Sequence, residues 1–235
     1  MNGLQVFLSI AKIIPRSIFE ERLGFITLWP RVANSVPGWC SGPDARLLFA
    51  FAHHGPGHGA IVEIGSAWGR STVFLARGSK LAKREKVFSI DPHTGDPFFI
   101  CGKKPQGPKL ENSEYKVDDG TEFNSYSGFL RTIRHFQIED WVIPLVMTSN
   151  EATKKTEIGP IRLLFIDGMH TYEAVKDDIN NWVPRVISGG VIVFDDYDNF
   201  TSGVGVKRAV DELLTSGLVD SALSRGRWHV WTTKK

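Results

Sequence analysis

Apolar residues recur along this chain in two patterns, short continuous runs and longer stretches with helical spacing. A short apolar run bounded by glycine or polar residues is typical of a strand buried on both faces, whereas apolar positions about three to four residues apart are typical of a helix. From residue 60 onward the two patterns alternate. They predict strands over residues 61–64, 87–90, 142–146, 163–166 and 191–194, and helices over residues 45–53, 71–81, 122–136, 172–187 and 206–214, with a short helix from residue 150.

Strands that alternate with helices predict an α/β fold, a doubly wound and mostly parallel sheet with helices on both faces. Residues 218–223 and 228–232 around Arg225-Gly226 predict a C-terminal hairpin, which adds an antiparallel edge to the sheet. The polar segment of residues 92–120 is too long for a plain connection. Loops of that length inside a domain are usually functional or disordered, so we expect a lid loop there.

Residues 1–40 differ from the rest of the chain and predict an N-terminal helical extension and connector, followed by one domain over residues 41–235. Residues 5–23 predict a helix with a break at Pro15, because proline lacks the backbone N–H that a helix interior uses. Residues 24–40 are rich in Trp, Pro and Gly and predict an ordered connector. We expect the N-terminal helix to pack on the domain or to pair subunits of a homo-oligomer, rather than to lie on a membrane.

The composition is that of an ordinary globular protein, with 42% hydrophobic and 23% charged residues in a chain of 235. The net charge of +2 is too close to neutral to indicate a nucleic-acid-binding protein. No apolar run is long enough for a transmembrane segment, and the basic leader and cleavage site of a signal peptide are absent. Two cysteines are too few for a disulfide scaffold, so we expect a cytoplasmic protein.

Acidic residues stand at the carboxyl ends of the predicted strands. Asp91, Asp167 and the pair Asp195-Asp196 each follow directly on a strand, and His170 lies shortly after Asp167. Because the carboxyl ends of parallel strands share one edge of the sheet, we expect these side chains to surround a ligand. Carboxylate oxygens are the ligands that hard divalent cations prefer, and the same carboxylates would repel one another without a cation. Asp167, Asp195 and Asp196 therefore predict a metal site; the alternative is that one caps the next helix and the others are solvated.

The glycine-rich turn after the first strand indicates what kind of ligand binds there. Gly65 and Gly69 allow a tight turn and a close approach to a ligand, but the G-x-G-x-x-G spacing of a dinucleotide turn is absent. Glu63 would repel phosphate and suit a cation, and Asp91 stands where an acid accepts hydrogen bonds from ribose hydroxyls. S-adenosylmethionine, which carries a ribose, no phosphate and a positive sulfonium, fits this description. The alternative is that Glu63 pairs with a basic neighbour and Asp91 caps a loop.

Four stretches of the chain resemble the successive motifs of one enzyme family. They are Glu63-Ile-Gly65-Ser-Ala-Trp-Gly69-Arg-Ser71-Thr72, Ser89-Ile-Asp91, Leu164-Phe-Ile-Asp-Gly-Met-His-Thr-Tyr172 and Gly189-Gly-Val-Ile-Val-Phe-Asp-Asp-Tyr197. Over roughly residues 36–235 the chain resembles the class I S-adenosylmethionine-dependent methyltransferases, most closely the methyltransferase-24 type of small O-methyltransferase. Relatives of that type include metal-dependent macrolide-sugar O-methyltransferases and, more distantly, catechol O-methyltransferases. The resemblance implies a Rossmann-like sheet of seven strands and S-adenosylmethionine as the cofactor.

The resemblance also implies roles for individual residues. His170 stands where macrolide-sugar relatives carry a histidine and catechol-type relatives a lysine base, and a histidine can accept a proton near neutral pH. The alternative for His170 is a helix cap or a substrate contact. The pair Asp195-Asp196 matches the macrolide type better than the catechol type, which has asparagine at the second position. The residues expected to bind the cofactor are Glu63, Gly65, Ser66, Gly69, Ser71, Asp91, His93, Ser149 and Asp167.

These observations predict an S-adenosylmethionine-dependent O-methyltransferase that uses a divalent metal, expected to be Mg²⁺, and acts on a hydroxyl of a small molecule such as a sugar or glycoside. Two alternatives stay open. One is a nicotinamide-dependent oxidoreductase on a related sheet, against which the missing G-x-G-x-x-G argues. The other is an S-adenosylmethionine-binding partner subunit without catalysis, against which the retained acids and His170 argue.

Overall fold

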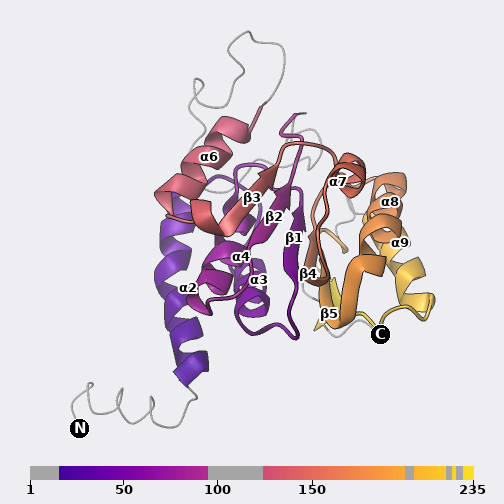
Figure 1. The fold of residues 1–235 in the computed structure, drawn as a ribbon, viewed down its shortest axis with the longest axis horizontal. Helices are drawn as coiled ribbons and strands as arrows, with labels where there is room; N and C mark the ends of the chain where they lie inside the picture. Colours follow the sequence, from indigo (N-terminus) through magenta and orange to yellow (C-terminus); the bar gives the residue numbers. More distant parts are fainter. Residues whose placement is uncertain (1–15, 95–123, 199–203, 221–223, 226–229) are drawn as a thin grey trace.

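Short apolar runs form the strands of one sheet, largely where the hydrophobic pattern predicts them (Figure 1). The computed structural model describes residues 16–94, 124–198, 204–220, 224–225 and 230–235. Within these ranges the strands are β1 (Ala60–Ile64), β2 (Val87–Ile90), β3 (Val142–Leu145), β4 (Ile161–Ile166), β5 (Val186–Phe194), β6 (Ser224–Arg225) and β7 (Val230–Thr233). They lie in the order β3-β2-β1-β4-β5-β7-β6.

The pairing of the strands confirms the predicted doubly wound sheet. β1 to β5 pair in parallel, and β7 runs antiparallel between β5 and β6. From β1 the sheet grows outward through β2 to β3, and the chain then returns to add β4 on the opposite side of β1. The two directions of growth part between β1 and β4, and such a switch point is where open α/β sheets bind their ligands, outside the carboxyl ends of the strands.

Helices cover both faces of the sheet (Figure 1). They are α2 (Arg16–Ser35), α3 (Gly42–His54), α4 (Arg70–Leu81), α6 (Tyr126–His135), α7 (Ser149–Lys155), α8 (Tyr172–Trp182) and α9 (Val204–Thr215). α2, α3, α4 and α6 lie on one face, with Phe49 and Phe74 in their buried cluster. α7, α8 and α9 lie on the other face, with Ile179 and Trp182 in theirs. Each face therefore has its own hydrophobic core.

The predicted connector over residues 24–40 is wrong for residues 24–35, because α2 continues as a helix to Ser35 with Pro30 inside it. Leu28 and Val32, one helical turn apart, are both buried in the core beneath α3 and α4. Burial of this face offsets the loss of the backbone hydrogen bond that a proline cannot make in a helix. The sequence prediction gave too much weight to the proline and too little to this burial. No helix in the described ranges is long and apolar enough to cross a bilayer.

Two further boundaries differ from the prediction near the carboxyl end of the chain. The helix predicted to reach residue 187 ends at Trp182, because a short 3-10 turn with Pro184 inside it covers Val183–Arg185 and β5 begins at Val186. The first strand of the predicted hairpin differs where the structure describes it. Val219 forms only an isolated bridge with Lys234, and β6 covers Ser224–Arg225; residues 221–223 lie outside the described ranges. The helical part of the prediction over residues 5–15 and its break lie outside the described residues.

A buried arginine ties the amino-terminal side of the sheet to α3. Arg162 on β4 is fully buried, and its Nε donates to Oε2 of Glu85 over 2.7 Å. Its two terminal nitrogens donate to the carbonyls of Phe51 and Ala52 over 3.0 and 2.6 Å. These carbonyls belong to the last turn of α3, where backbone donors run out; the Phe51 carbonyl also accepts the amide of Gly55 over 2.8 Å. One side chain therefore caps α3 and neutralises Glu85 at the end of the sheet opposite to the strand-end acids.

Replacing Arg162 with methionine should lower the free energy of unfolding by roughly 3 kcal/mol. The Ala52 carbonyl would lose its donor, the Phe51 carbonyl would keep only the Gly55 amide, and Glu85 would lose the buried guanidinium that pairs with it. Lys155→Met is the matched control, since the ion pair of Lys155 with Glu151 is exposed and solvent screening leaves such pairs little effect on stability. Urea unfolding followed by circular dichroism measures both variants. Equal, small losses would show that Arg162 does not have this role.

Candidate active site

The turn after β1 and the turn after β4 lie against each other, backbone to backbone. Gly65 has a φ of +86°, in the left-handed region that glycine adopts without a steric penalty. A Cβ atom at this position would lie 2.6 Å from the carbonyl carbon of Asp167 and 3.0 Å from Cα of Gly168, so only glycine fits. The amide of Asp167 donates to the carbonyl of Ile64 over 2.8 Å, which continues the β1–β4 pairing into the turns. The glycine turn and the first predicted acid are therefore held as one unit.

Three of the five residues other than glycine with a left-handed backbone in the described ranges lie at the same edge of the sheet. Ala67 after β1, His93 after β2 and Asp196 after β5 have φ values of 43°, 57° and 54°. Such conformations cost roughly 1–3 kcal/mol each and persist mainly where function requires them. Backbone strain therefore occurs at three strand ends where site residues were predicted. It supports the carboxyl edge of the sheet as the functional edge.

Glu63 is fully buried and surrounded by hydroxyl groups. Its carboxylate accepts hydrogen bonds from Ser71 Oγ and Thr72 Oγ1, both over 2.6 Å, and from Ser89 Oγ over 3.0 Å. Burial raises the pKa of Glu63 to about 7, although these hydrogen bonds act in the opposite direction. The side chain therefore joins β1, β2 and the start of α4 beneath the glycine turn. Contact of Glu63 and Ser71 with a cofactor stays a prediction, and their visible role is to support the turn.

Asp91 holds the shape of the glycine turn. Its Oδ2 accepts the amides of Ser66 and Ala67, both over 2.8 Å, and its Oδ1 accepts the amide of His93 over 2.6 Å. Gly69, with a φ of +85°, then opens α4. The carboxylate of Asp91 remains 15% exposed, so it can also meet a ligand. The structure thus brings four of the predicted cofactor residues, Ser66, Gly69, Asp91 and His93, around one turn.

His93 links the end of β2 to α6. Its Nδ1 lies 2.9 Å from Ser125 Oγ, and its ring centroid lies 5.1 Å from those of Tyr126 and Phe129. Burial lowers its pKa, and the nearby Asp91 opposes that shift. Thr94 then forms a β-bridge with Asn124. The predicted lid loop falls almost wholly between these two residues, and its residues 95–120 lie outside the described ranges.

Ser149, predicted to bind the cofactor, directs its hydroxyl toward α8, where it donates to Asp178. Burial raises the pKa of Asp178 to about 6, and this pair connects the loop after β3 with α8. Sequence reasoning missed Asp178, although a signal existed. It lies between Val175, Ile179 and Trp182 on the face of the helix that the apolar pattern marks as buried. A carboxylate on such a face needs a partner.

Asp167, Asp195, Asp196 and His170 are brought together from the ends of β4 and β5. His170 is nearly buried, with Nδ1 3.3 Å from Oδ2 of Asp196 and Nε2 3.7 Å from Oδ1 of Asp167. These are ion-pair separations rather than aligned hydrogen bonds. Burial and then the charge of Asp196 raise the pKa of Asp167 well above its usual value, while burial and then Asp167 do the same for Asp195. The four residues therefore form one electrostatic group.

Two further residues belong to this group and were not predicted. The charge of Asp44, at the start of α3, adds to the rise in pKa of both Asp167 and Asp195. Burial raises the pKa of the Cys40 thiol, and Asp44 and Asp195 raise it further. In the sequence Asp44 fits a helix capping box, and its Oδ2 does accept the amide of Ser41 over 3.1 Å. Only the packing of α3 against the sheet reveals its second role.

The carboxylates fit a divalent cation in their chemistry, since hard oxygen ligands suit Mg²⁺ and a cation would relieve their mutual repulsion. Their arrangement is less complete. In the parts of the chain that the structure describes, no group of three or more His, Cys, Asp or Glu side chains is arranged to hold a metal ion. Asp167, Asp195 and Asp196 would have to reorient around a cation, and the side chain of Asp167, 29% exposed, has room for this.

Comparison with family models matches residues 62–197 to a methyltransferase domain of the methyltransferase-24 type, a range that includes every predicted site residue. Among curated proteins, the uncharacterized protein R132 of Acanthamoeba polyphaga mimivirus is 28% identical over 153 residues, which are 65% of this chain and 58% of the viral protein. The uncharacterized protein y4gI of Sinorhizobium fredii is 27% identical over 147 residues, 60% of this chain and 16% of that protein. The chain thus spans only part of the length of these relatives.

Solved structures share the fold. The O-methyltransferase NovP has a TM-score of 0.61 at 19% identity, covering 82% of this chain and 78% of NovP. An O-methyltransferase from Bacillus cereus in complex with SAH has a TM-score of 0.59 at 16% identity, covering 98% and 97%. CalS11, a TDP-rhamnose 3'-O-methyltransferase of calicheamicin biosynthesis, has a TM-score of 0.52 at 15% identity, covering 81% and 77%. Identities this low establish a common fold alone.

The raised pKa of the buried Glu63 predicts a pH dependence of the protein's stability. Its folded-state pKa of about 7 lies above the ordinary value of 4.5, so the unfolded chain ionises first as the pH rises. Wild-type protein should therefore lose stability between pH 4.5 and 7 relative to Glu63→Gln, by about 3 kcal/mol at most, with no further change above pH 7. Urea unfolding at a series of pH values measures the difference. A difference that does not vary with pH would contradict the buried, ionisable state of Glu63.

Proposed function

The chain belongs to the methyltransferase domain family, and we propose that it transfers the methyl group of S-adenosylmethionine to a hydroxyl group of a small molecule. The observation that carries the proposal is the placement of His170 beside Asp167 and Asp196, next to the turn that Gly65 locks against Asp167. The proposed site for the methyl donor and the proton acceptor would then adjoin each other at the switch point of the sheet. The shared fold with methyltransferases solved in other organisms supports this reading.

S-adenosylmethionine would lie across the carboxyl ends of β1 and β2. The partly exposed carboxylate of Asp91 suits the ribose hydroxyls, and Asp167 offers negative charge to the sulfonium group. Gly65 lets the backbone approach the ligand closely. Glu63, Ser71 and Ser149 would support the pocket wall rather than touch the ligand, because their polar atoms are already hydrogen-bonded within the protein. The SAH bound to the Bacillus cereus structure supports the same ligand here.

His170 would take the proton of the acceptor hydroxyl. S-adenosylmethionine supplies an electrophilic methyl group on its sulfonium sulfur. Nε2 of His170 would accept the proton as the hydroxyl oxygen forms its bond to the methyl carbon, and the carbon–sulfur bond breaks to leave S-adenosylhomocysteine. Asp196, next to Nδ1, would orient the ring and stabilise the imidazolium that results. Holding the two reactants in line supplies much of the rate.

We also propose that Asp167, Asp195 and Asp196 hold a divalent cation, Mg²⁺ by its preference for oxygen ligands. A bound cation supplies a lower pKa for the acceptor hydroxyl. The support is the chemistry of the three carboxylates, together with burial and the charges of neighbouring acids, which raise the pKa values of Asp167 and Asp195. Because no group of three described side chains is already arranged to hold a metal ion, removal of metal from the enzyme is the test of this proposal.

A sugar-type hydroxyl is the acceptor that we favour. The pairing of His170 with the acids after β5 resembles the macrolide-sugar enzymes, and CalS11, which shares the fold, acts on TDP-rhamnose. The family match gives no support to a nicotinamide-dependent oxidoreductase. A partner subunit that binds the cofactor without catalysis is the remaining alternative. We further propose that α2 pairs subunits, since Leu23 and Ile26 are 48% and 65% exposed on it, and the mass of the protein in solution tests this.

His170→Gln should lower kcat by roughly 10²- to 10⁴-fold, because the general base is lost, while the Kd for S-adenosylhomocysteine stays within about threefold of wild type. His135→Gln, an exposed change on α6, is the control and should leave both unchanged. The assay follows S-adenosylhomocysteine release with TDP-rhamnose as the first acceptor and catechol as the comparison. Full activity of His170→Gln would exclude His170 as the base.

Excess chelator should abolish methylation, and added Mg²⁺ should restore it. Asp167→Ala should remove the stimulation by metal and leave the binding of S-adenosylhomocysteine mostly intact, measured by calorimetry. Undiminished activity in excess chelator would exclude a requirement for a divalent cation and would leave the proposed role of His170 as the base unchanged. Loss of S-adenosylhomocysteine binding in Asp167→Ala would instead assign this acid to the cofactor alone.

A further inference from the structure

The second residue of α9, Gly205, lies directly on the backbone of the turn that carries His170. A Cβ atom at position 205 would lie 2.5 Å from the carbonyl oxygen of His170 and 2.8 Å from the carbonyl carbon of Thr171, with the amide nitrogen of Tyr172 also in contact. These are backbone atoms at the entrance to α8, so they cannot rotate away as the end of a flexible side chain can. Any side chain at this position must displace either α9 or the His170 turn.

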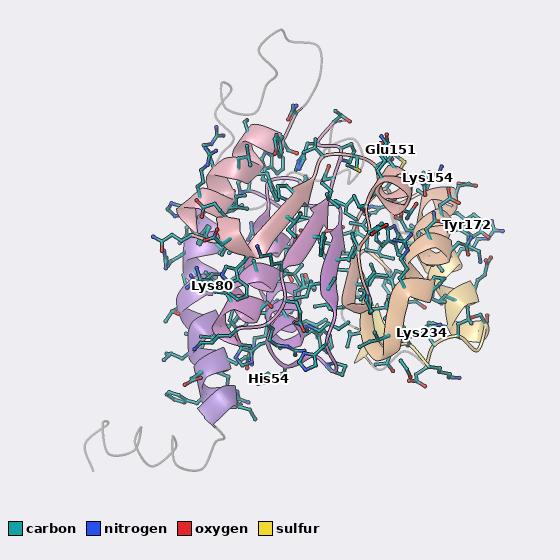
Figure 2. The ribbon with its side chains drawn as sticks, in the orientation of Figure 1. His54, Lys80, Glu151, Lys154, Tyr172 and Lys234 are labelled. Atoms are coloured by element: carbon teal, nitrogen blue, oxygen red, sulfur yellow. The ribbon has the colours of Figure 1, made fainter. Side chains whose placement is uncertain are left out.

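Farther along, α9 is fastened to α8. The hydroxyl of Tyr172 donates to Oε2 of Glu212 over 3.0 Å, and Lys176 donates to the same oxygen over 2.7 Å. The guanidinium of Arg208 lies 4.0 Å from the centroid of the Tyr172 ring. Figure 2 shows Tyr172 on the side of the molecule formed by α8 and α9. The contact of Gly205 is therefore the first of a row of contacts that hold the two helices together.

The same helix is also fastened to the end of β5. The hydroxyl of Tyr197 donates to Asp211, and Lys207 donates to the Tyr197 hydroxyl over 2.9 Å. Tyr197 is buried and follows Asp196 directly in the chain. One helix thus contacts both the turn that carries His170 and the turn that carries Asp196.

His170 and Asp196 come from different strands, and their separation of 3.3 Å depends on how the turns after β4 and β5 sit relative to each other. We propose that α9 sets this relation, and that Gly205 is a positioning residue for the methyl transfer. The inference rests on the proposed function in taking His170 as the base. Gly205 acts through the backbone of His170 and does not itself touch a substrate.

Gly205→Ala tests the proposal, and Gly159→Ala is the matched control because no described atom lies within 4 Å of a Cβ built there. Small displacements of a catalytic group can cost roughly 10²-fold in rate. We expect Gly205→Ala to lower kcat by roughly 10- to 100-fold with acceptor KM and S-adenosylhomocysteine Kd within about threefold. In protein labelled with ¹³C at the histidine rings, the His170 resonance, assigned through His170→Gln, should move in Gly205→Ala and stay in place in Gly159→Ala.

The NMR measurement requires no methyl acceptor, so it tests the role of Gly205 separately from the proposed methyl transfer. A His170 resonance that moves only in Gly205→Ala supports the contact even if no methylation is found. An unchanged resonance, or a kcat within twofold of wild type, overturns the role of Gly205. If Gly205→Ala does not fold, Tyr172→Phe combined with Tyr197→Phe removes both hydroxyl contacts of α9. This variant should shift the same resonance and lower kcat several-fold, and no change in either would overturn the proposal.

Discussion

The backbone of the turn after β1 lies directly against the backbone of the turn after β4, and the site depends on this contact. Gly65 alone among residue types fits there, because a Cβ would meet the carbonyl group of Asp167. Asp91 holds the rest of the first turn through the amides of Ser66 and Ala67. The pocket proposed for S-adenosylmethionine and the acid beside His170 are thereby fixed relative to each other by main-chain packing, which side-chain motion cannot alter.

Charge is the second constraint on the site. Burial and then the charge of Asp196 raise the pKa of Asp167, while burial and then the charge of Asp167 raise the pKa of Asp195. The charge of Asp44, at the start of α3, adds to both rises. A group of acids at one edge of a sheet is stable only when positive charge or protons compensate it. His170 supplies one partner for Asp196 and Asp167, and the sulfonium of the proposed cofactor or a divalent cation would supply others. In the proposed reaction the positive charge would pass from the sulfonium to the imidazolium of His170, so it would stay beside the acids.

The sequence was informative where a pattern is local. Apolar runs placed the parallel strands, and an acid directly after a run placed Asp91, Asp167 and Asp195 at one edge. Burial decided the rest: α2 continues through Pro30 because its apolar face is covered. Contacts between distant elements, such as the approach of Gly205 to the His170 backbone, leave no mark on spacing or composition, because they depend on how helices pack.

The central claim is that the turn locked by Gly65 forms a pocket for S-adenosylmethionine and not for a dinucleotide. Calorimetric titration of the protein with S-adenosylhomocysteine, and in parallel with NADH, tests it most directly. We predict that the protein binds S-adenosylhomocysteine saturably and does not bind NADH. The substitution Asp91→Ala should strongly weaken the binding of S-adenosylhomocysteine. Binding of NADH without binding of S-adenosylhomocysteine would contradict it.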